Sequence, residues 1–518
     1  MPNVRSKVDI HTLFELISSH GSNVENISSE KILEIIEELL VVAKTRMQDI
    51  VVILPGITGS VLQKDGKDIW AFSGQAAWQG LKTLGESLQQ LRIEQDDPEA
   101  EDLGDGIKAT RLAADAHLVP GLVKIDGYTS LTRLITDNFQ VIPGNIREDK
   151  PANLFEFPYD WRRDNRASAR LLKKNLDERL HQWQEYTGNQ DAKVILLAHS
   201  MGGLVSRYYL EVLEGWRDCK ALFTFGTPHR GSVNAVNFVA NSYKKLFMDL
   251  TEVLRSLPSI YQLMPIYKVV KIGEEYHRIA EVDNLPNVVR TRAENALAFH
   301  REIEAAVNGN QNNADYLKSY KIIPIVGTQQ PTMQSVLLED GQLTTDSALP
   351  RGIDPELASG DGSVPHLSAI PIELSQEYRE TYIAERHGSL QNNPRVLEEL
   401  RNRLITTQAQ SLRSIRDGVP EVSPLAAKRA AISLALDDLY LADEPVRLSA
   451  RVLNGDKKLS ALKAEITSVS GKGRAINVEF QQQGEDWELL LDDLAAGLYR
   501  VRVHTGEIQV QDLFEVVK

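Results

Sequence analysis

Short, continuous apolar runs recur through the middle of the chain. The clearest covers residues 193–198, and others lie at 50–54, 221–225 and 321–326. Strands that are buried on both faces of a parallel sheet have this pattern, because helices cover both sides of such a sheet. A stretch with helical spacing at 167–186 leads into the run at 193–198. The pattern therefore predicts strand–helix–strand units and a parallel α/β sheet.

The start of the chain has the spacing of helices. An early helix is expected over 10–17, and the apolar residues of 29–40 fall on one helical face: Ile32, Ile35, Ile36, Leu39 and Leu40. We expect residues 1–48 to form a helical segment packed on the domain that follows. A docking module for a partner is the alternative.

The pattern changes after Pro420. Residues 445–452, 475–480 and 498–503 alternate between apolar and polar, with turns between them. About six or seven short strands of this kind predict an immunoglobulin-like β-sandwich over 421–518. Such a unit serves recognition or assembly, or it is a passive stabilising appendage.

Composition and charge narrow the function classes. The chain has 518 residues, a formal net charge of −14 and no block of Lys and Arg, which argues against nucleic acid as a partner. A single cysteine, Cys219, excludes an intrachain disulfide and favours a reducing compartment. The first residues lack the apolar core of a signal peptide, and no run is long enough to span a membrane. We therefore expect a cytoplasmic protein with, at most, peripheral membrane contact.

The run at 193–198 ends in the turn Ala198-His199-Ser200-Met201-Gly202-Gly203. This turn resembles the nucleophile elbow G-x-S-x-G, with Ala198 in place of the first glycine. A serine attacks only when a base takes its proton and its oxygen stands clear of the backbone, which a sharp strand-to-helix turn provides. The same turn directs the N–H of Met201 at a developing oxyanion. The alternative is an ordinary glycine-rich turn with an incidental serine.

A glycine-flanked loop, 55–60, follows the predicted strand at 50–54. Loops of this kind turn backbone N–H groups inward, and we assign the second oxyanion donor to the N–H of Ile57. A simple turn is the alternative.

Several further motifs carry a family resemblance. They are Leu54-Pro55-Gly56, Pro158-Tyr159-Asp160-Trp161-Arg162, the turn at 198–203, Gly226-Thr227-Pro228, the stretch 258–265 and Gly360-Asp361-Gly362-Ser363-Val364-Pro365. Together they resemble the lecithin:cholesterol acyltransferase-like family of α/β-hydrolases, which includes lysosomal phospholipases and acyltransferases. The resemblance spans residues 50–405. The animal members are secreted and carry a disulfide that staples a lid-like loop, so lid behaviour is not carried over to a chain with one cysteine.

The resemblance implies Ser200 as nucleophile, Asp361 as acid and His387 as base. This order along the chain is the one that α/β-hydrolases use. His387 would take the serine proton and return it to the leaving group, and Asp361 would fix the tautomer of His387. Other residues near these motifs are expected to be structural: Asp160 and Arg162 as a loop-bracing pair, and His199, His229 and His366 as packing or loop residues.

Residues 233–320 separate two predicted sheet strands and are long for a connection, so we expect them to form a cap over the site. One apolar helical face of this segment could bind an acyl chain or a lipid surface: Leu246, Phe247, Leu250, Val253, Leu254 and Leu257. The alternative is a cap helix seated on the core. Candidate substrate contacts are Trp70, Phe247 and Leu250.

The sequence thus predicts a helical segment over 1–48, an α/β-hydrolase catalytic domain over 49–418 with a cap at 233–320, and a β-sandwich over 421–518. The predicted function is a serine hydrolase, a phospholipase or lipase, that cleaves or transfers acyl esters through an acyl-enzyme without a metal or organic cofactor. The expected partners are a lipid or acyl-ester substrate, a membrane surface, and a protein that binds the terminal modules. The alternative is a partner-regulated recognition or signalling protein that uses the hydrolase domain as a scaffold.

Overall fold

A computed structural model describes most of the chain. The described residues are 44–71, 88–113, 116–119, 123–245, 248–374, 381–409, 430–454, 461–470, 474–506 and 508–517. The helices expected at 10–17 and 29–40, the residue Phe247 and the domain boundary expected at 418–421 lie outside them. None of the described helices is long and apolar enough to cross a membrane.

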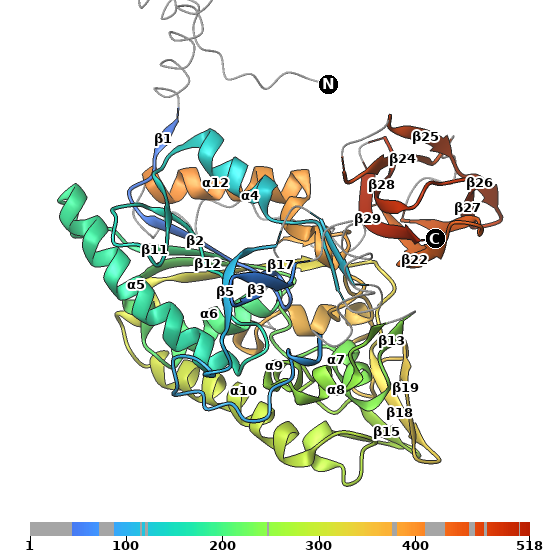
Figure 1. Ribbon diagram of the computed structural model, residues 1–518, viewed down its shortest axis with the longest axis horizontal. Helices are drawn as coiled ribbons and strands as arrows, with labels where there is room; N and C mark the ends of the chain where they lie inside the picture. The colour runs from blue at the N-terminus through green and yellow to red at the C-terminus, as the bar shows by residue number, and fades with distance from the viewer. Residues whose placement is uncertain are drawn as a thin grey trace, which may run out of the picture.

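A parallel seven-stranded sheet forms the centre of the α/β unit (Figure 1). Its strand order is β20-β17-β12-β11-β2-β10-β9, and the bounds are β20 (Tyr382–Ile383), β17 (Lys321–Gly327), β12 (Cys219–Phe225), β11 (Val194–His199), β2 (Ile50–Leu54), β10 (Leu154–Glu156) and β9 (Pro143–Asn145). All of the neighbouring pairs run parallel. The four apolar runs of the sequence therefore become adjacent central strands, and the predicted parallel α/β sheet is confirmed.

Helices cover both faces of this sheet (Figure 1). One face carries α4 (Thr129–Asn138) and α12 (Pro394–Ala409), and the other carries α5 (Asn165–Thr187), α6 (Met201–Glu211) and α10 (Arg290–Asn310). Successive strand residues point to opposite faces. Accordingly, Val52 and Leu54 of β2 join the core with α5, α6 and α10, while Val51 and Ile53 join the core with α4 and α12.

The segment 233–320 lies between β12 and β17 in the chain. It contains the helices α7 (Val233–Ala240), α8 (Thr251–Ser256), α9 (Pro258–Gln262), α10 and α11 (Tyr316–Ser319), and the strands β13 (Lys244–Lys245), β14 (Met248–Asp249), β15 (Val270–Ile272) and β16 (Glu275–His277). Strands β15 and β16 belong to a four-stranded sheet with β18 (Ser335–Glu339) and β19 (Gln342–Asp346). Leu246 and Phe247 lie outside the described residues, and over 248–257 the expected single helix is replaced by β14 and the short α8.

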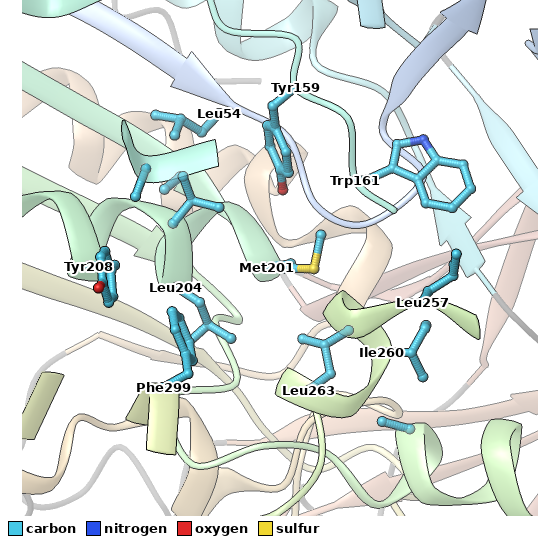
Figure 2. Packing of buried hydrophobic residues seen from close by; sticks show 14 of the residues in the cluster. Leu54, Tyr159, Trp161, Met201, Leu204, Tyr208, Leu257, Ile260, Leu263 and Phe299 are labelled. Carbon is cyan, nitrogen blue, oxygen red and sulfur yellow. The ribbon is translucent and has the colours of Figure 1, made fainter. Parts of the chain in front are cut away.

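The apolar residues of that stretch turn inward. Leu250, Val253, Leu254 and Leu257 are buried in the same core as α5 and α6. Figure 2 shows this core from close by, with Leu257, Ile260 and Leu263 of the inserted segment facing Met201, Leu204, Tyr159 and Trp161 of the α/β unit. The inserted segment and the sheet therefore share one hydrophobic core, as the alternative interpretation of this face predicted.

Smaller elements complete the α/β unit. They are the pair β1 (Thr45–Arg46) and β8 (Phe139–Gln140), the sheet of β3 (Ser60–Lys64), β4 (Lys67–Trp70) and β5 (Ile107–Leu112), and the pair β6 (His117–Val119) and β7 (Val123–Ile125). Short 3-10 helices are η2 (Gly215–Arg217), η3 (Ile279–Glu281), η4 (Pro355–Leu357), η5 (His366–Ala369), η6 (Ile372–Leu374) and η7 (His387–Asn392). Because β1 pairs with β8, the sheet-containing unit already includes residue 45.

Residues 431–517 form two further sheets, drawn in orange to red in Figure 1. The strands are β21 (Ala431–Leu436), β22 (Leu439–Leu441), β23 (Val446–Leu453), β24 (Lys463–Ser468), β25 (Ile476–Glu479), β26 (Gln481–Gln483), β27 (Asp486–Leu491), β28 (Gly497–Thr505) and β29 (Ile508–Val517). The sheets β21-β23-β27-β26 and β22-β29-β28-β24-β25 contribute to one core, which includes Leu448, Trp487, Val501 and Phe514. We call residues 431–517 the C-terminal unit; its immunoglobulin-like topology stays a prediction.

The loop after β10 is braced by charge pairs, as the sequence predicted for Asp160 and Arg162. The Arg162 side chain is fully buried; its Nε donates to Asp160 Oδ1 at 2.9 Å, and its Nη1 to Asp105 Oδ2 at 2.9 Å. Removing one partner of a buried pair leaves the other charge without compensation.

We therefore expect Arg162→Met to lower the free energy of unfolding by about 3 kcal/mol, measured by urea titration. The control is Arg111→Ala, which breaks an exposed pair with Asp68 and should cost about 0–1 kcal/mol. Equal losses in the two variants would contradict the bracing role.

Candidate active site

The turn between β11 and α6 holds Ser200 in a conformation that side chains rarely adopt. Its φ is +50° and its ψ is −123°. Such backbone strain persists only where the surroundings fix it, and it occurs at nucleophile elbows. A Cβ atom at Gly202 would lie 2.5 Å from the Pro55 carbonyl oxygen, and one at Gly203 would lie 2.0 Å from Thr227 Oγ1. The two glycines are therefore required by close packing around the turn.

Three side chains from distant loops meet at this turn. His387 Nε2 lies 2.9 Å from Ser200 Oγ, and His387 Nδ1 lies 2.7 Å from Asp361 Oδ2. The second oxygen of Asp361 accepts the N–H groups of Ser363 and Val364, at 2.9 and 2.7 Å. Because an ionised carboxylate only accepts, Nδ1 of a neutral His387 carries the hydrogen and Nε2 is left to accept the serine proton.

The residues assigned as oxyanion donors lie on either side of Ser200. Met201 is the first residue of α6, so its N–H has no acceptor within the helix. The loop that carries Ile57 touches the serine, since a Cβ atom at Gly56 would lie 2.9 Å from Ser200 Cβ. Ile57 also lines the cavity at Ser200. Neither N–H donates to another described residue, and both are placed where a substrate oxygen could accept them.

A cavity of about 70 Å³ opens at Ser200 and His387. Its wall is largely apolar and includes Ile57, Ile125, Phe238, Leu263 and Val364. Residues Phe238 and Leu263 come from the inserted segment. The arrangement can hold an apolar group beside a nucleophile.

A second chain of hydrogen bonds lies next to Ser200. The Gly56 N–H donates to the Tyr128 hydroxyl oxygen at 2.9 Å, Tyr128 Oη lies 3.0 Å from His199 Nδ1, and His199 Nε2 lies 3.1 Å from the His387 carbonyl oxygen. A carbonyl oxygen can only accept, so Nε2 of His199 carries the hydrogen, and Tyr128 donates to Nδ1. These hydrogen bonds thus connect the loop of Ile57 to the backbone of His387.

Burial lowers the pKa of His199 to about 3, and the nearby His387 adds to this shift. The imidazole of His199 is therefore neutral at ordinary pH. The chain of hydrogen bonds requires this, because Nδ1 can accept the Tyr128 hydroxyl only when it carries no hydrogen. The sequence predicted a packing residue here and gave no signal for Tyr128, which lies 71 positions away.

The candidate substrate contacts lie elsewhere. The Trp70 ring is buried 4.9 Å from the ring of Trp161, and its N–H donates to the Thr58 carbonyl oxygen. Leu250 is buried in the core. Neither residue lines the cavity, and Phe247 is outside the described residues. Ile125 and Phe238 do line the cavity but were not predicted from the sequence, because nothing local to either residue marks it as part of a cavity.

The two other histidines considered are buried. Burial lowers the pKa of His229 well below its ordinary value and that of His366 to about 4. Neither one is hydrogen-bonded to Ser200 or Asp361.

The parallel sheet and the strained serine at a strand-to-helix turn define an α/β-hydrolase. The family model of lecithin:cholesterol acyltransferase matches residues 123–397, which is more than half of the chain. The chain belongs to this family, and the matched region contains Ser200, Asp361 and His387.

Among solved structures, the chain is similar to the lipase BlEst2 of Bacillus licheniformis in its propeptide form. The identity is 14%, the match covers 91% of this chain and 73% of the lipase chain, and the TM-score is 0.29. A search of curated proteins found no match. The family assignment therefore rests on the match over residues 123–397.

Tyr128→Phe removes the shared hydroxyl and leaves the Gly56 N–H and His199 Nδ1 without their partner. We expect a loss of about 1–3 kcal/mol in the free energy of unfolding and a roughly tenfold lower kcat for ester cleavage, equivalent to about 1.4 kcal/mol of barrier.

The matched control is Tyr440→Phe. The Tyr440 hydroxyl also accepts a backbone N–H, from Asp437, and donates to a backbone carbonyl, that of Arg447. This variant should lose stability and keep its kcat. If Tyr128→Phe had the kcat of the wild-type protein, these hydrogen bonds would have no role in positioning the active site.

The pH dependence of kcat/KM gives a further check. His387 must be neutral to take the serine proton, so activity falls as the pH is lowered. Because burial lowers the pKa of His199 to about 3, this histidine stays neutral in the range above pH 4 and takes up no proton there. We therefore expect His199 to add nothing to the acidic limb, whose slope should be about one log unit per pH unit. A slope near two would show that a second group, such as His199, also titrates.

Proposed function

We propose that this protein is a serine esterase that cleaves or transfers acyl esters of lipids, with phospholipids as the leading substrate class. The observation that carries the proposal is the hydrogen-bonded line from Asp361 through His387 to a strained Ser200. The family match adds support, since the family is named for acyl transfer between lecithin and cholesterol. The apolar wall of the cavity suits an acyl chain.

The reaction begins when Ser200 Oγ attacks the ester carbonyl carbon and His387 Nε2 takes the serine proton. Asp361 stabilises the imidazolium that forms. The negative charge on the carbonyl oxygen is stabilised by the N–H groups of Ile57 and Met201. Collapse of this intermediate breaks the ester C–O bond, His387 returns the proton to the leaving alcohol, and an acyl-enzyme remains.

The second half of the reaction repeats these roles. Water or an acceptor alcohol gives its proton to His387 and attacks the acyl-enzyme, which releases an acid or a new ester and restores Ser200. Each step uses only side chains and N–H groups of the chain.

The same proposal includes roles for the inserted segment and the C-terminal unit. Residues 233–320 act as the cap, which is supported by Phe238 and Leu263 in the cavity wall. The C-terminal unit is an immunoglobulin-like β-sandwich, supported by two sheets around one core. We place the protein in the cytoplasm, where its single cysteine suits a reducing compartment. Contact with a lipid surface and binding of a protein partner stay predictions.

Ser200→Ala should lower ester turnover by on the order of 10³-fold or more while the protein stays folded. The measurement is release of fatty acid from phospholipid in mixed micelles, followed by mass spectrometry, with and without an added alcohol acceptor. The control is Ser206→Ala on the same helix, whose hydroxyl only donates to the Gly202 carbonyl oxygen. Full turnover by Ser200→Ala would end the proposal, whereas wild-type protein without any turnover would favour the scaffold alternative. A new ester formed with the alcohol would show acyl transfer, and free acid alone would show hydrolysis.

A further inference from the structure

The C-terminal unit places a buried carboxylate beside the active-site loops. Asp512 of β29 has a side chain that is 4% exposed, and its Oδ2 lies 3.0 Å from Arg386 Nε and 3.1 Å from Lys124 Nζ. Its Oδ1 accepts the Leu513 N–H at 2.9 Å. Burial alone would raise the pKa of Asp512, but Arg386, Lys124 and the Leu513 N–H hold it below its ordinary value. The carboxylate is therefore ionised and forms ion pairs with both Arg386 and Lys124.

Both cations stand next to residues of the site. Arg386 precedes His387 in the chain, and Lys124 itself lines the cavity together with Ile125. The two loops also touch directly, because the Asp126 N–H donates to the Gly388 carbonyl oxygen at 2.9 Å. A Cβ atom at Gly388 would lie only 1.9 Å from the Lys124 carbonyl oxygen. With no space between them, a shift of one loop must move the other.

Further contacts of the C-terminal unit reach the same loops. The Gln511 N–H donates to Glu385 Oε1 at 3.0 Å, and Arg500 Nε donates to Asp126 Oδ1 at 2.9 Å. Glu385 lies two residues before His387. In Figure 1, β29 lies on the side of the C-terminal unit that faces the α/β unit.

The C-terminal unit also reaches the loop of Asp361, through Gln330. Gln330 Nε2 donates to the Ile432 carbonyl oxygen at 2.9 Å, and the Leu434 N–H donates to Gln330 Oε1 at 3.2 Å. The backbone of Gln330 in turn forms a parallel bridge with Asp361. The C-terminal unit thus contacts the neighbours of both the carboxylate and the imidazole.

We propose that the C-terminal unit is a working part of the catalytic site, and that Asp512 is a positioning residue that holds the His387 loop against the cavity wall through Arg386 and Lys124. The inference rests on the proposed esterase function. A passive appendage would stabilise the protein without affecting the rate per folded active site. A positioning role requires that the rate fall when the carboxylate is neutralised, because small displacements of a reacting group slow the chemical step.

The test is Asp512→Asn in the full-length protein, which keeps the size of the side chain and removes its charge. Activity on a soluble short-chain ester is divided by the active-site concentration from complete fluorophosphonate titration, so unfolded protein does not count. We expect kcat to fall by about 10- to 100-fold with KM changed less than twofold, and Asp512→Glu to restore part of kcat.

The matched control is Asp486→Asn in the same unit, where the carboxylate pairs with Arg451 on an exposed surface. It should keep the wild-type kcat. If Asp512→Asn does not fold, Arg386→Met removes one of the two cations, which does not line the cavity, and should also lower kcat.

The outcomes distinguish a failure of the esterase function from a failure of the positioning role. Wild-type protein that neither hydrolyses the ester nor reacts with a fluorophosphonate would overturn the esterase function itself. Active wild-type protein together with unchanged kcat in Asp512→Asn, or in Arg386→Met where Asp512→Asn does not fold, would overturn only the positioning role and leave the C-terminal unit as a stabilising appendage.

Discussion

One imidazole must lie between a hydroxyl and a carboxylate, and this requirement constrains much of the structure around the site. The Nδ1 of His387 is bound by Asp361, its backbone carbonyl oxygen by His199, and its preceding residue by Asp512. His387 is the first residue of the short 3-10 helix η7, and the partners of its imidazole and carbonyl oxygen come from outside that helix. Its position therefore depends on the loop of Asp361, on the turn of Ser200 and on the C-terminal unit.

Close packing imposes a second constraint on the same region. A Cβ atom at Gly226, whose φ is +58°, would lie 2.8 Å from Asp361 Oδ2 and 2.9 Å from His387 Nδ1. Gly226 thus lets the backbone approach Asp361 and His387, while Gly202 and Gly388 pack against the carbonyl oxygens of Pro55 and Lys124. Glycines at these positions cost chain entropy on folding. The large shared core lies beneath the turn, and Figure 2 shows it around Met201 and Leu204.

The sequence predicted features whose causes are local or periodic. The runs at 50–54 and 193–198 predicted the central strands, and the turn at 198–203 predicted a serine at a strand-to-helix junction. Non-local pairings were missed. Tyr128 meets His199 only because α4 folds onto the sheet, and Asp96, in an acidic run typical of a solvated loop, is buried against Arg163. Buried pairs of this kind depend on tertiary packing, which hydrophobic periodicity does not encode. The same limit explains why Trp70 and Leu250, chosen as substrate contacts, lie in the core.

The central claim is that the folded arrangement makes Ser200 a nucleophile. It is tested most directly by treating the native protein with a fluorophosphonate and locating the adduct by peptide mass spectrometry. The account predicts modification of Ser200, with none in the urea-unfolded protein, because the strain and the imidazole that activate the hydroxyl are lost on unfolding. A native protein that stays unmodified, or that carries the adduct on a different serine, would contradict the account.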